Sequence, residues 1–240
     1  MEMLSGKRIV LVGGTSGMGA AAARVAQAEG AEVVIASRSG EKVAAMVASL
    51  GGAEAGVNGV TLDVRSTESI EAGLATIGPY DHIFITASPG GRSKFEGPVE
   101  DAMDYFEGKF WSSYRIARES VAHLRPGGSI LFVTGTMSQR PHGAAAVTAA
   151  FSAVEGLTRA LAIELAPLRV NCLRPGFVAT EFWNFMPDGQ REKMIEERTA
   201  EIPVGKAGTG EDIGRAAVAF MANEYISGQI LTIDGAALLK

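Results

Sequence analysis

The sequence is poor in the residues that build disulfides and metal centres. It has one cysteine, Cys172, and three histidines among 240 residues. A single cysteine excludes an intramolecular disulfide, argues against a cysteine-based metal cluster and is typical of a cytoplasmic protein. We therefore expect no metal site, a cytoplasmic location and a buried, apolar role for Cys172.

Excess positive charge and long apolar runs are also missing. The chain has 22 Lys and Arg against 27 Asp and Glu, and its net charge of −5 argues against a nucleic-acid partner. No apolar run approaches the roughly 18 residues of a membrane span, so we expect no contact with a membrane. Residues 1–8 precede the first apolar run and are too few for a signal peptide.

What the sequence does have is a regular alternation of short apolar runs and helical stretches. The predicted strands are 8–13, 32–36, 57–62, 81–86, 129–134, 168–173 and 229–233, and the predicted helices are 17–29, 40–50, 66–77, 99–124, 143–165, 182–199 and 210–223. This order predicts an α/β fold: a Rossmann-type, doubly wound parallel sheet of about seven strands with helices on both faces. We see no linker or repeat, so residues 1–240 are expected to form one domain.

A glycine-rich turn joins the first strand to the first helix. Gly13 allows a tight turn, Gly17 lets the backbone approach a pyrophosphate, and Gly19 lets helix and strand pack closely. The helix N-terminus offers free N–H groups and a partial positive charge to phosphate. We therefore predict a dinucleotide site whose loop also includes three residues between these glycines, namely Thr15, Ser16 and Met18.

The second predicted strand ends in Ser37, Arg38 and Ser39, where a site for NAD usually has a carboxylate that binds the ribose hydroxyls. A guanidinium with two hydroxyls is suited to a 2′-phosphate instead. This favours NADP (NADPH) as the cofactor over NAD. The alternative is that Arg38 is a solvated loop residue.

Several segments together resemble the short-chain dehydrogenase/reductase (SDR) superfamily. They are the glycine spacing 13–17–19, the run 155–162, Pro175-Gly176 with Val178 and Thr180, and the ending 228–235. The resemblance implies that Pro175, Gly176, Val178 and Thr180 line the nicotinamide side. It also implies that Asp63, beside Val64, contacts the adenine, and that Thr86, Ala87 and Ser88, before Pro89–Gly91, lie near the nicotinamide ribose. Asp63 has a second interpretation as the cap of the helix beginning near Ser66.

The resemblance fails at the catalytic pair Tyr-x-x-x-Lys. Alignment of the following residues places Val147 at the tyrosine position and Phe151 at the lysine position, and no Tyr or Lys occurs between Arg140 and Arg169. Neither side chain exchanges a proton. The family's serine is not located uniquely either, because Thr134, Gly135, Thr136 and Ser138 all fall within a small shift.

Other residues are therefore candidates for the chemistry. The resemblance aligns Lys109 with the helix asparagine of SDR active sites, so its amine is expected to face the pocket and to replace the missing lysine or act as a general acid. Thr134, Thr136 or Ser138 would hold a substrate oxygen. His142 and Tyr114 are weaker candidates. The alternative for Lys109 is a helix-surface lysine that extends its amine into solvent.

Three functions stay open at this point. The chain is an NADP(H)-dependent oxidoreductase for a small apolar carbonyl or alcohol, a catalytically inactive NADP(H)-binding sensor or partner subunit, or an enzyme of another reaction on the same fold. By analogy with the family we expect a substrate lid at about 181–205, with Phe182, Trp183, Phe185 and Met186 facing the substrate. The same analogy, with the alanine-rich stretch 143–165, implies a homodimer or homotetramer.

Overall fold

The computed structural model describes residues 2–88, 95–187 and 189–240. The strands are β1 (Arg8–Val12), β2 (Glu32–Ser37), β3 (Val57–Thr61), β4 (Tyr80–Ile85), β5 (Leu124–Val133), β6 (Arg169–Pro175) and β7 (Ile230–Ile233). The α-helices are α1 (Gly17–Ala28), α2 (Gly40–Ser49), α3 (Thr67–Ile77), α4 (Val99–Phe106), α5 (Ser112–Ser120), α6 (Ala145–Glu164), α7 (Gln190–Ala200) and α8 (Gly210–Ala222). Shorter helical turns are η1 (Ala53–Ala55), the π-helical η2 (Glu107–Trp111), η3 (Thr136–Ser138), η4 (Glu181–Phe185) and η5 (Ala237–Leu239).

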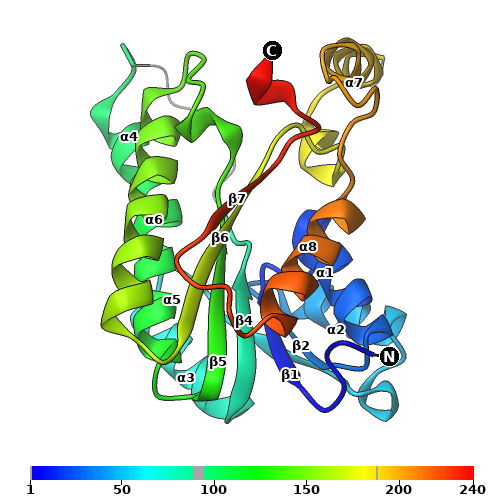
Figure 1. Ribbon diagram of the computed structural model, residues 1–240, viewed down its shortest axis with the longest axis vertical. Coiled ribbons are helices and arrows are strands. Elements are labelled where there is room, and N and C mark those ends of the chain that lie inside the picture. Colours follow the sequence, from blue (N-terminus) through cyan, green and yellow to red (C-terminus); the bar gives the residue numbers. More distant parts are fainter. Residues whose placement is uncertain (1, 89–94, 188) are drawn as a thin grey trace.

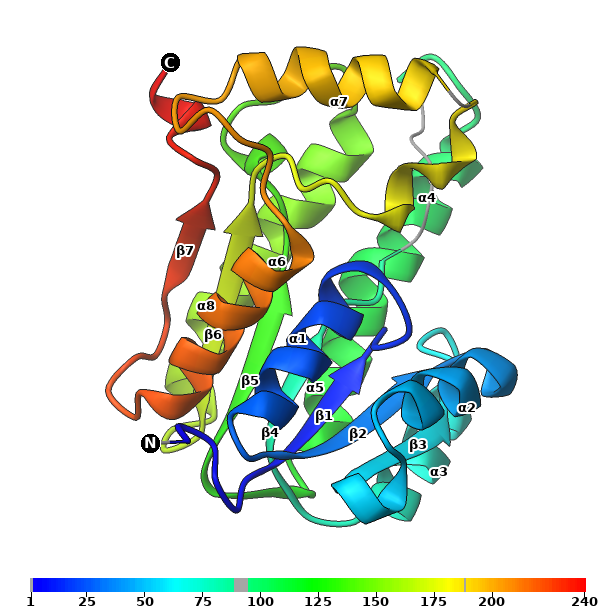
Figure 2. The ribbon, with the colours of Figure 1, turned by 90° about the vertical axis from the view of Figure 1, so that its right-hand side faces the viewer.

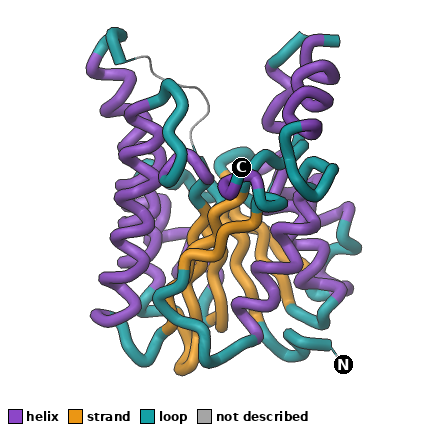
Figure 3. The backbone as a smooth tube through the Cα atoms, turned by 45° about the horizontal axis from the view of Figure 1, so that its top comes forward, coloured by secondary structure: helices purple, strands orange, loops and turns teal. Residues whose placement is uncertain are grey.

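The strands form one parallel sheet in the order β3-β2-β1-β4-β5-β6-β7. Helices cover both faces, as Figure 1 shows, and Figure 3 shows the strands between the two helical layers. The predicted doubly wound α/β fold is therefore confirmed. All strands point their carboxyl ends at one edge of the sheet, and α7 lies across that edge in Figure 2.

Alternation along the strands divides the core into two layers. Ile9 and Leu11 of β1 face α1, α2 and α8, whereas Val10 and Val12 face α3, α5 and α6. Strand β1 is buried on both faces, which explains why it appears in the sequence as a continuous apolar run.

Two predicted helices differ from the structure. The stretch 182–199 is the short turn η4 followed by α7, because Pro187 lacks an N–H and Gly189 has a φ of +80°. The stretch 99–124 ends at Ser120 and contains the π-helical turn η2. Ser112 Oγ and Ser113 Oγ donate to the carbonyls of Gly108 and Lys109 at 2.8 and 2.7 Å, next to this widened turn. The strand expected at 129–134 begins earlier, at Leu124.

Helix α6 corrects the expectation that no segment is long and apolar enough to cross a membrane. By length and composition it passes that test, with a mean hydropathy of 1.3 over an 18-residue window. A core helix passes the same test, and α6 packs on the sheet through Val154 and Leu157. The apolar character of α6 is therefore weak support for a membrane span.

His82 on β4 gives the fold a measurable pH dependence. It is 3 % exposed, its Nδ1 lies 2.8 Å from Ser129 Oγ, and burial together with the nearby Arg169 lowers its pKa from 6.5 to about 4. On lowering the pH, the His82 ring therefore takes up a proton near pH 6.5 in the unfolded chain but only near pH 4 in the folded chain. We expect the free energy of unfolding to fall by up to about 1.4 kcal/mol per pH unit as the pH drops from 6.5 to about 4.

Urea unfolding at a series of pH values measures this dependence. His82→Asn keeps a polar partner for Ser129 and should flatten the profile in that range, whereas His142→Asn, at an exposed position, should leave it unchanged. An unaltered slope in His82→Asn would assign the titration to another group.

Candidate functional site

A cleft of about 1650 Å³ lies at the carboxyl ends of the strands. It opens between β1 and β4, where the order of the strands in the sheet reverses, which is where open α/β sheets bind ligands. Every predicted cofactor residue except Ser39 lines it: Gly13, Thr15, Ser16, Gly17, Met18, Gly19, Ser37, Arg38, Asp63, Val64, Thr86, Ala87, Ser88, Pro175, Gly176, Val178 and Thr180. Pro89–Gly91, which continue the loop after Ser88, lie outside the described residues.

The glycine turn has the geometry of an anion-binding loop. Gly13 and Gly17 have φ values of +86° and +52°, and a Cβ on Gly13 would lie 2.7 Å from Thr86 Oγ1. Ser16 occupies the N-cap of α1 without a side-chain capping bond. The N–H of Gly17 donates instead to Glu181 Oε2 at 3.2 Å. A carboxylate thus occupies the position at the helix N-terminus where a phosphate oxygen is expected.

The end of β2 is basic. Arg38 and Lys42 both line the cleft, and the segment 37–39 offers no carboxylate. In the same part of the cleft, Thr15 Oγ1 donates a hydrogen bond to Ser37 Oγ at 3.3 Å. Ser39 is the N-cap of α2, and its Oγ accepts the Lys42 N–H at 3.3 Å. Its hydroxyl is therefore used to cap the helix. Lys42 was missed in the sequence, although it stands four residues after Arg38 in the first turn of the following helix.

Asp63 does not cap α3. Ser66 is the N-cap and accepts the Ser69 N–H at 3.1 Å, while Asp63 Oδ1 accepts the Arg65 N–H at 3.0 Å. The second interpretation of Asp63 is therefore wrong, and its side chain lies in a turn at the cleft wall.

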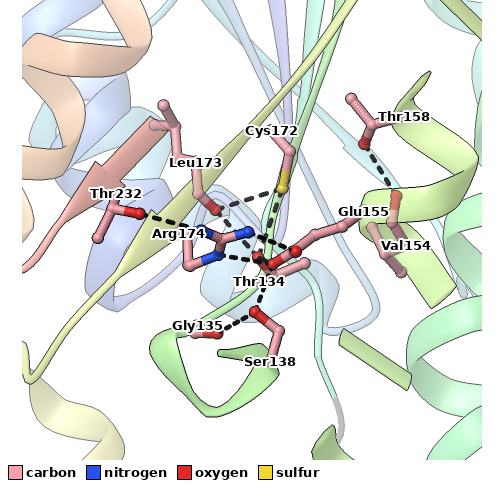
Figure 4. A network of polar contacts seen from close by, with 10 residues as sticks. All are labelled: Thr134, Gly135, Ser138, Val154, Glu155, Thr158, Cys172, Leu173, Arg174 and Thr232. Carbon is pink, nitrogen blue, oxygen red and sulfur yellow. Dashed lines mark hydrogen bonds and ion pairs between the residues drawn. The ribbon is translucent and has the colours of Figure 1, made fainter. Parts of the chain in front are cut away.

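Two of the predicted catalytic hydroxyls form hydrogen bonds to a buried carboxylate, as Figure 4 shows. Thr134 Oγ1 and Ser138 Oγ donate to Glu155 Oε1 at 3.0 and 2.6 Å. Arg174 donates to both Glu155 oxygens, through Nε at 2.9 Å and Nη2 at 2.5 Å, and also to Thr232 Oγ1 at 3.1 Å. Burial opposes the ionisation of Glu155, but these bonds outweigh it and hold its pKa below the ordinary value. The network ties β5, α6, β6 and β7 together.

Thr136 is the loop hydroxyl left for a substrate. It lines the cleft, and the described part of the chain offers its hydroxyl no hydrogen-bond partner. Ser138 does not line the cleft. The sequence could not show which hydroxyl is available, because Thr134 and Ser138 are bonded to Glu155. This residue lies 17 residues from Ser138 and 21 residues from Thr134 along the chain.

The wall formed by α6 is apolar. Val147 is 5 % exposed and packs with Tyr105, Met137 and Ala150. The Phe151 ring covers Gly135 so closely that a Cβ on Gly135 would lie 2.8 Å from Phe151 Cε2. A side chain at position 135 would therefore require the ring to move.

Lys109 faces the same wall from η2. Its Nζ lies 5.8 Å from the centre of the Phe151 ring and donates to the Val133 carbonyl at 2.7 Å. The residue is 1 % exposed, so it is not a solvent-extended lysine. Burial lowers its pKa from 10.5 to about 8, with a small opposing influence of Cys172. An amine that titrates near neutral pH in a cleft is suited to proton transfer.

The weaker candidates lie elsewhere. Tyr114 on α5 is partly exposed, packs edge-on against Trp111 and at a tilt against Phe110, and does not line the cleft. His142 lines the cleft, is exposed, and its Nδ1 lies 3.0 Å from the Arg140 carbonyl oxygen. Among the residues that the structure describes, no group of three or more His, Cys, Asp or Glu could hold a metal ion.

The expected lid begins beside the cleft. Trp183 packs on Phe177 and donates Nε1–H to the Val178 carbonyl at 3.0 Å, while Phe182 and Phe185 are 53 % and 73 % exposed. Phe182 and Trp183 line the cleft, whereas Phe185 and Met186 do not. Asp188, within the expected lid, lies outside the described residues.

Comparison with known proteins gives consistent matches along the chain. Residues 12–236 match the family profile described as enoyl-(acyl carrier protein) reductase. The short-chain dehydrogenase/reductase ATR9 of Stachybotrys chlorohalonatus is 31% identical over 258 aligned residues, which cover 100% of both chains. Galactitol 2-dehydrogenase (L-tagatose-forming) of Cereibacter sphaeroides is 31% identical over 97% of this chain and 95% of its own.

Solved structures match the whole fold. A small-chain dehydrogenase in complex with NADPH has a TM-score of 0.82 and 30% identity, over 98% of this chain and 99% of its own. The MalC reductase/Diels–Alderase of Malbranchea aurantiaca has a TM-score of 0.92 and 25% identity, over 100% and 99%.

The contact between Phe151 and Gly135 predicts a strong coupling. Gly135→Ser should destabilise the protein by about 1–3 kcal/mol, because its Cβ overlaps the ring. In a Phe151→Ala background the same substitution should cost little. Chemical denaturation of the four proteins measures the coupling.

Gly156→Ser is the matched control, since a Cβ at Gly156 on α6 meets nothing within 4 Å. Equal destabilisation by Gly135→Ser with and without the ring would show that the ring does not exclude a side chain there.

Proposed function

This chain belongs to the short-chain dehydrogenase/reductase family, and we propose on that premise that it is an NADP(H)-dependent oxidoreductase with a non-standard proton donor. Members of the family bind a nicotinamide cofactor, and this chain is an oxidoreductase of that family. The preference for NADP(H), the substrate class and the proton path are the proposed parts.

The observation that carries the proposal is the bond from the Gly17 N–H to the Glu181 carboxylate, since it marks a place that accepts an anionic oxygen. The cofactor fits the cleft around it. Gly13, Gly17 and Gly19 would hold the pyrophosphate, and Arg38 with Lys42 would hold a 2′-phosphate. Bound in this way, the nicotinamide supplies or accepts the hydride. The solved structure of a similar small-chain dehydrogenase contains NADPH, and this supports NADP(H) as the cofactor proposed for the present chain.

The proton that accompanies the hydride needs a source at the Phe151 end of the cleft. Val147 and Phe151 cannot provide it, and the Thr134 and Ser138 hydroxyls donate to Glu155. Lys109 is charged below its pKa of about 8 and lies against the same wall. We therefore propose that the Lys109 ammonium supplies the proton and a positive charge at this end of the cleft. The Thr136 hydroxyl is proposed to form a hydrogen bond with the substrate oxygen.

The proposed substrate is a small, largely apolar carbonyl or alcohol. Met137, Val147, Phe177 and Trp183 line this part of the cleft, and the segment 181–205 would close over it as a lid. Residues 1–240 would act as one domain.

We expect a homodimer or homotetramer. Helices α5 and α6 expose the apolar side chains of Tyr114 and Ile163, at 41 % and 80 %. A cytoplasmic location, with no nucleic-acid or membrane partner, stays a prediction.

A second candidate function is a cofactor-binding sensor or partner subunit without catalysis. The apolar wall of Val147, Phe151 and Gly135 favours it, because none of these residues handles a proton. Consumption of NADPH by the wild-type protein against a panel of carbonyl compounds separates the two functions.

Arg38 should set the cofactor preference. Arg38→Ala should weaken NADPH binding by about 1–3 kcal/mol, because a charge-assisted bond to the 2′-phosphate is lost, and should leave NADH binding nearly unchanged. Calorimetric titration with both cofactors measures this. Arg118→Ala, at an exposed guanidinium on α5, should change neither affinity. Equal losses for NADPH and NADH would refute the assignment.

Lys109 should control the chemical step. Lys109→Met keeps the length of the side chain and removes the amine, so single-turnover hydride transfer should slow by about 10²-fold or more while NADPH affinity changes little. In wild type, carbonyl reduction should decline as the pH rises through about 8, because the protonated form is lost. A mutant with full activity and the same pH profile would contradict this role.

A further inference from the structure

Glu181 lies where two cavities meet. It begins η4 and lines both the cleft and a second cavity of about 1100 Å³, whose walls come from α1, α7, α8 and the segment 179–184. Gly17, the first residue of α1, also lines both cavities. The Glu181 side chain therefore stands between the glycine turn and the second cavity.

The backbone that carries Glu181 is anchored. The Ala179 N–H donates to the Gly208 carbonyl at 2.9 Å, and the Trp183 N–H donates to the Thr180 carbonyl at 3.2 Å. The Glu181 side chain is exposed, so it can rotate without breaking these backbone bonds. A change in the position of its carboxylate therefore requires no movement of the helix α7.

The Glu181 carboxylate uses a donor that a bound pyrophosphate would need. Its Oε2 accepts the Gly17 N–H at 3.2 Å, and Ser16 at the N-cap forms no side-chain capping bond that would replace this contact. The partial positive charge of a helix N-terminus stabilises a carboxylate as it stabilises a phosphate. Two anions at one N–H repel each other, so the carboxylate has to leave before a phosphate oxygen takes its place.

The second cavity offers the displaced carboxylate another partner. Arg24 lines this cavity and stands seven residues after Gly17, which places both on the same face of α1. Within residues 2–88, 95–187 and 189–240, nothing forms a hydrogen bond or an ion pair with the Arg24 guanidinium. Rotation of Glu181 toward Arg24 would exchange a bond to a backbone N–H for an ion pair.

We infer that Glu181 sets the cofactor affinity as an internal competitor, whose carboxylate the cofactor pyrophosphate displaces toward Arg24. This inference rests on the proposed NADP(H)-dependent function and names the residue that weakens binding at that site. Only molecules in which the carboxylate has left the Gly17 N–H are ready for the cofactor. The apparent affinity is therefore reduced by the fraction of such molecules.

Calorimetric titration of wild type and Glu181→Gln tests the competition. The amide keeps the shape of the side chain and removes its charge, so NADPH and NADH should both bind more tightly by the same factor, about fivefold or more. Adenosine 2′-monophosphate has no pyrophosphate, and its affinity should stay within about twofold, since its phosphate is expected at Arg38. An equal gain for adenosine 2′-monophosphate would overturn the competition at Gly17.

Two variants separate the contact from the general effect of charge. Glu181→Asp keeps the charge but shortens the side chain, so it should also bind NADPH more tightly than wild type. Glu211→Gln is the matched control: it removes a carboxylate that lines the same second cavity but accepts from Arg215 Nη2 at 2.6 Å. NADPH affinity should change by no more than about twofold in this control. A wild-type affinity in Glu181→Asp, or a gain in Glu211→Gln as large as in Glu181→Gln, would contradict a direct contact.

A double-mutant cycle tests Arg24 as the new partner. Arg24→Gln should weaken NADPH binding by about twofold or more in wild type and little in Glu181→Gln, because the ion pair needs both side chains. Equal losses in the two backgrounds would show that Arg24 attracts the cofactor without Glu181 and would overturn its role as the partner.

The outcomes also separate this inference from the proposed function. If wild type and Glu181→Gln bind NADPH with the same affinity, the competition is wrong and the proposed function stands. If neither protein binds NADPH, both are refuted.

Discussion

The close approach of β1, α1 and β4 at the glycine turn is the constraint on which the site depends. Thr86 donates both its N–H and its hydroxyl to the Val12 carbonyl, at 2.8 and 2.9 Å. Gly13 donates to the Ala36 carbonyl at 2.8 Å, which joins β2 to the same point. A Cβ on Gly19 would lie 2.6 Å from Thr86 Oγ1, so the turn exists only without side chains at this position. The ends of β1, β2 and β4 therefore meet at this turn, and the turn lines the cleft.

Two buried charges near this cleft are stabilised in different ways. Glu155 accepts hydrogen bonds from Arg174, Thr134 and Ser138, so its ionised form is preferred in spite of burial. Among the residues that the structure describes, Lys109 Nζ donates one hydrogen bond, to the Val133 carbonyl, and lies over the Phe151 ring. Burial removes much of the hydration of this ammonium, which explains the downward shift of its pKa to about 8. This contrast favours a structural role for Glu155 and supports the proposed role of Lys109 in proton transfer.

The sequence predicts the fold and the cofactor end of the site better than the catalytic end. The apolar runs and the glycine spacing are local signals, and the sheet with its phosphate loop follows from them. The directions of Thr134 and Ser138 are not local, because they are set by Glu155 on a helix that follows the loop. The predicted single helix 182–199 was wrong, because Pro187 and Gly189 interrupt the helical periodicity around them.

Gly135, Val147 and Phe151, the three positions without polar side chains, are packed closely with their neighbours. Phe151 takes the space that a side chain at Gly135 would need, and Val147 is enclosed by Met137, Ala150 and Tyr105. Gly135, Val147 and Phe151 all line the cleft, so these packed positions form part of its wall. At Val147 and Phe151 the α6 wall of the cleft is therefore apolar and offers no group that exchanges a proton.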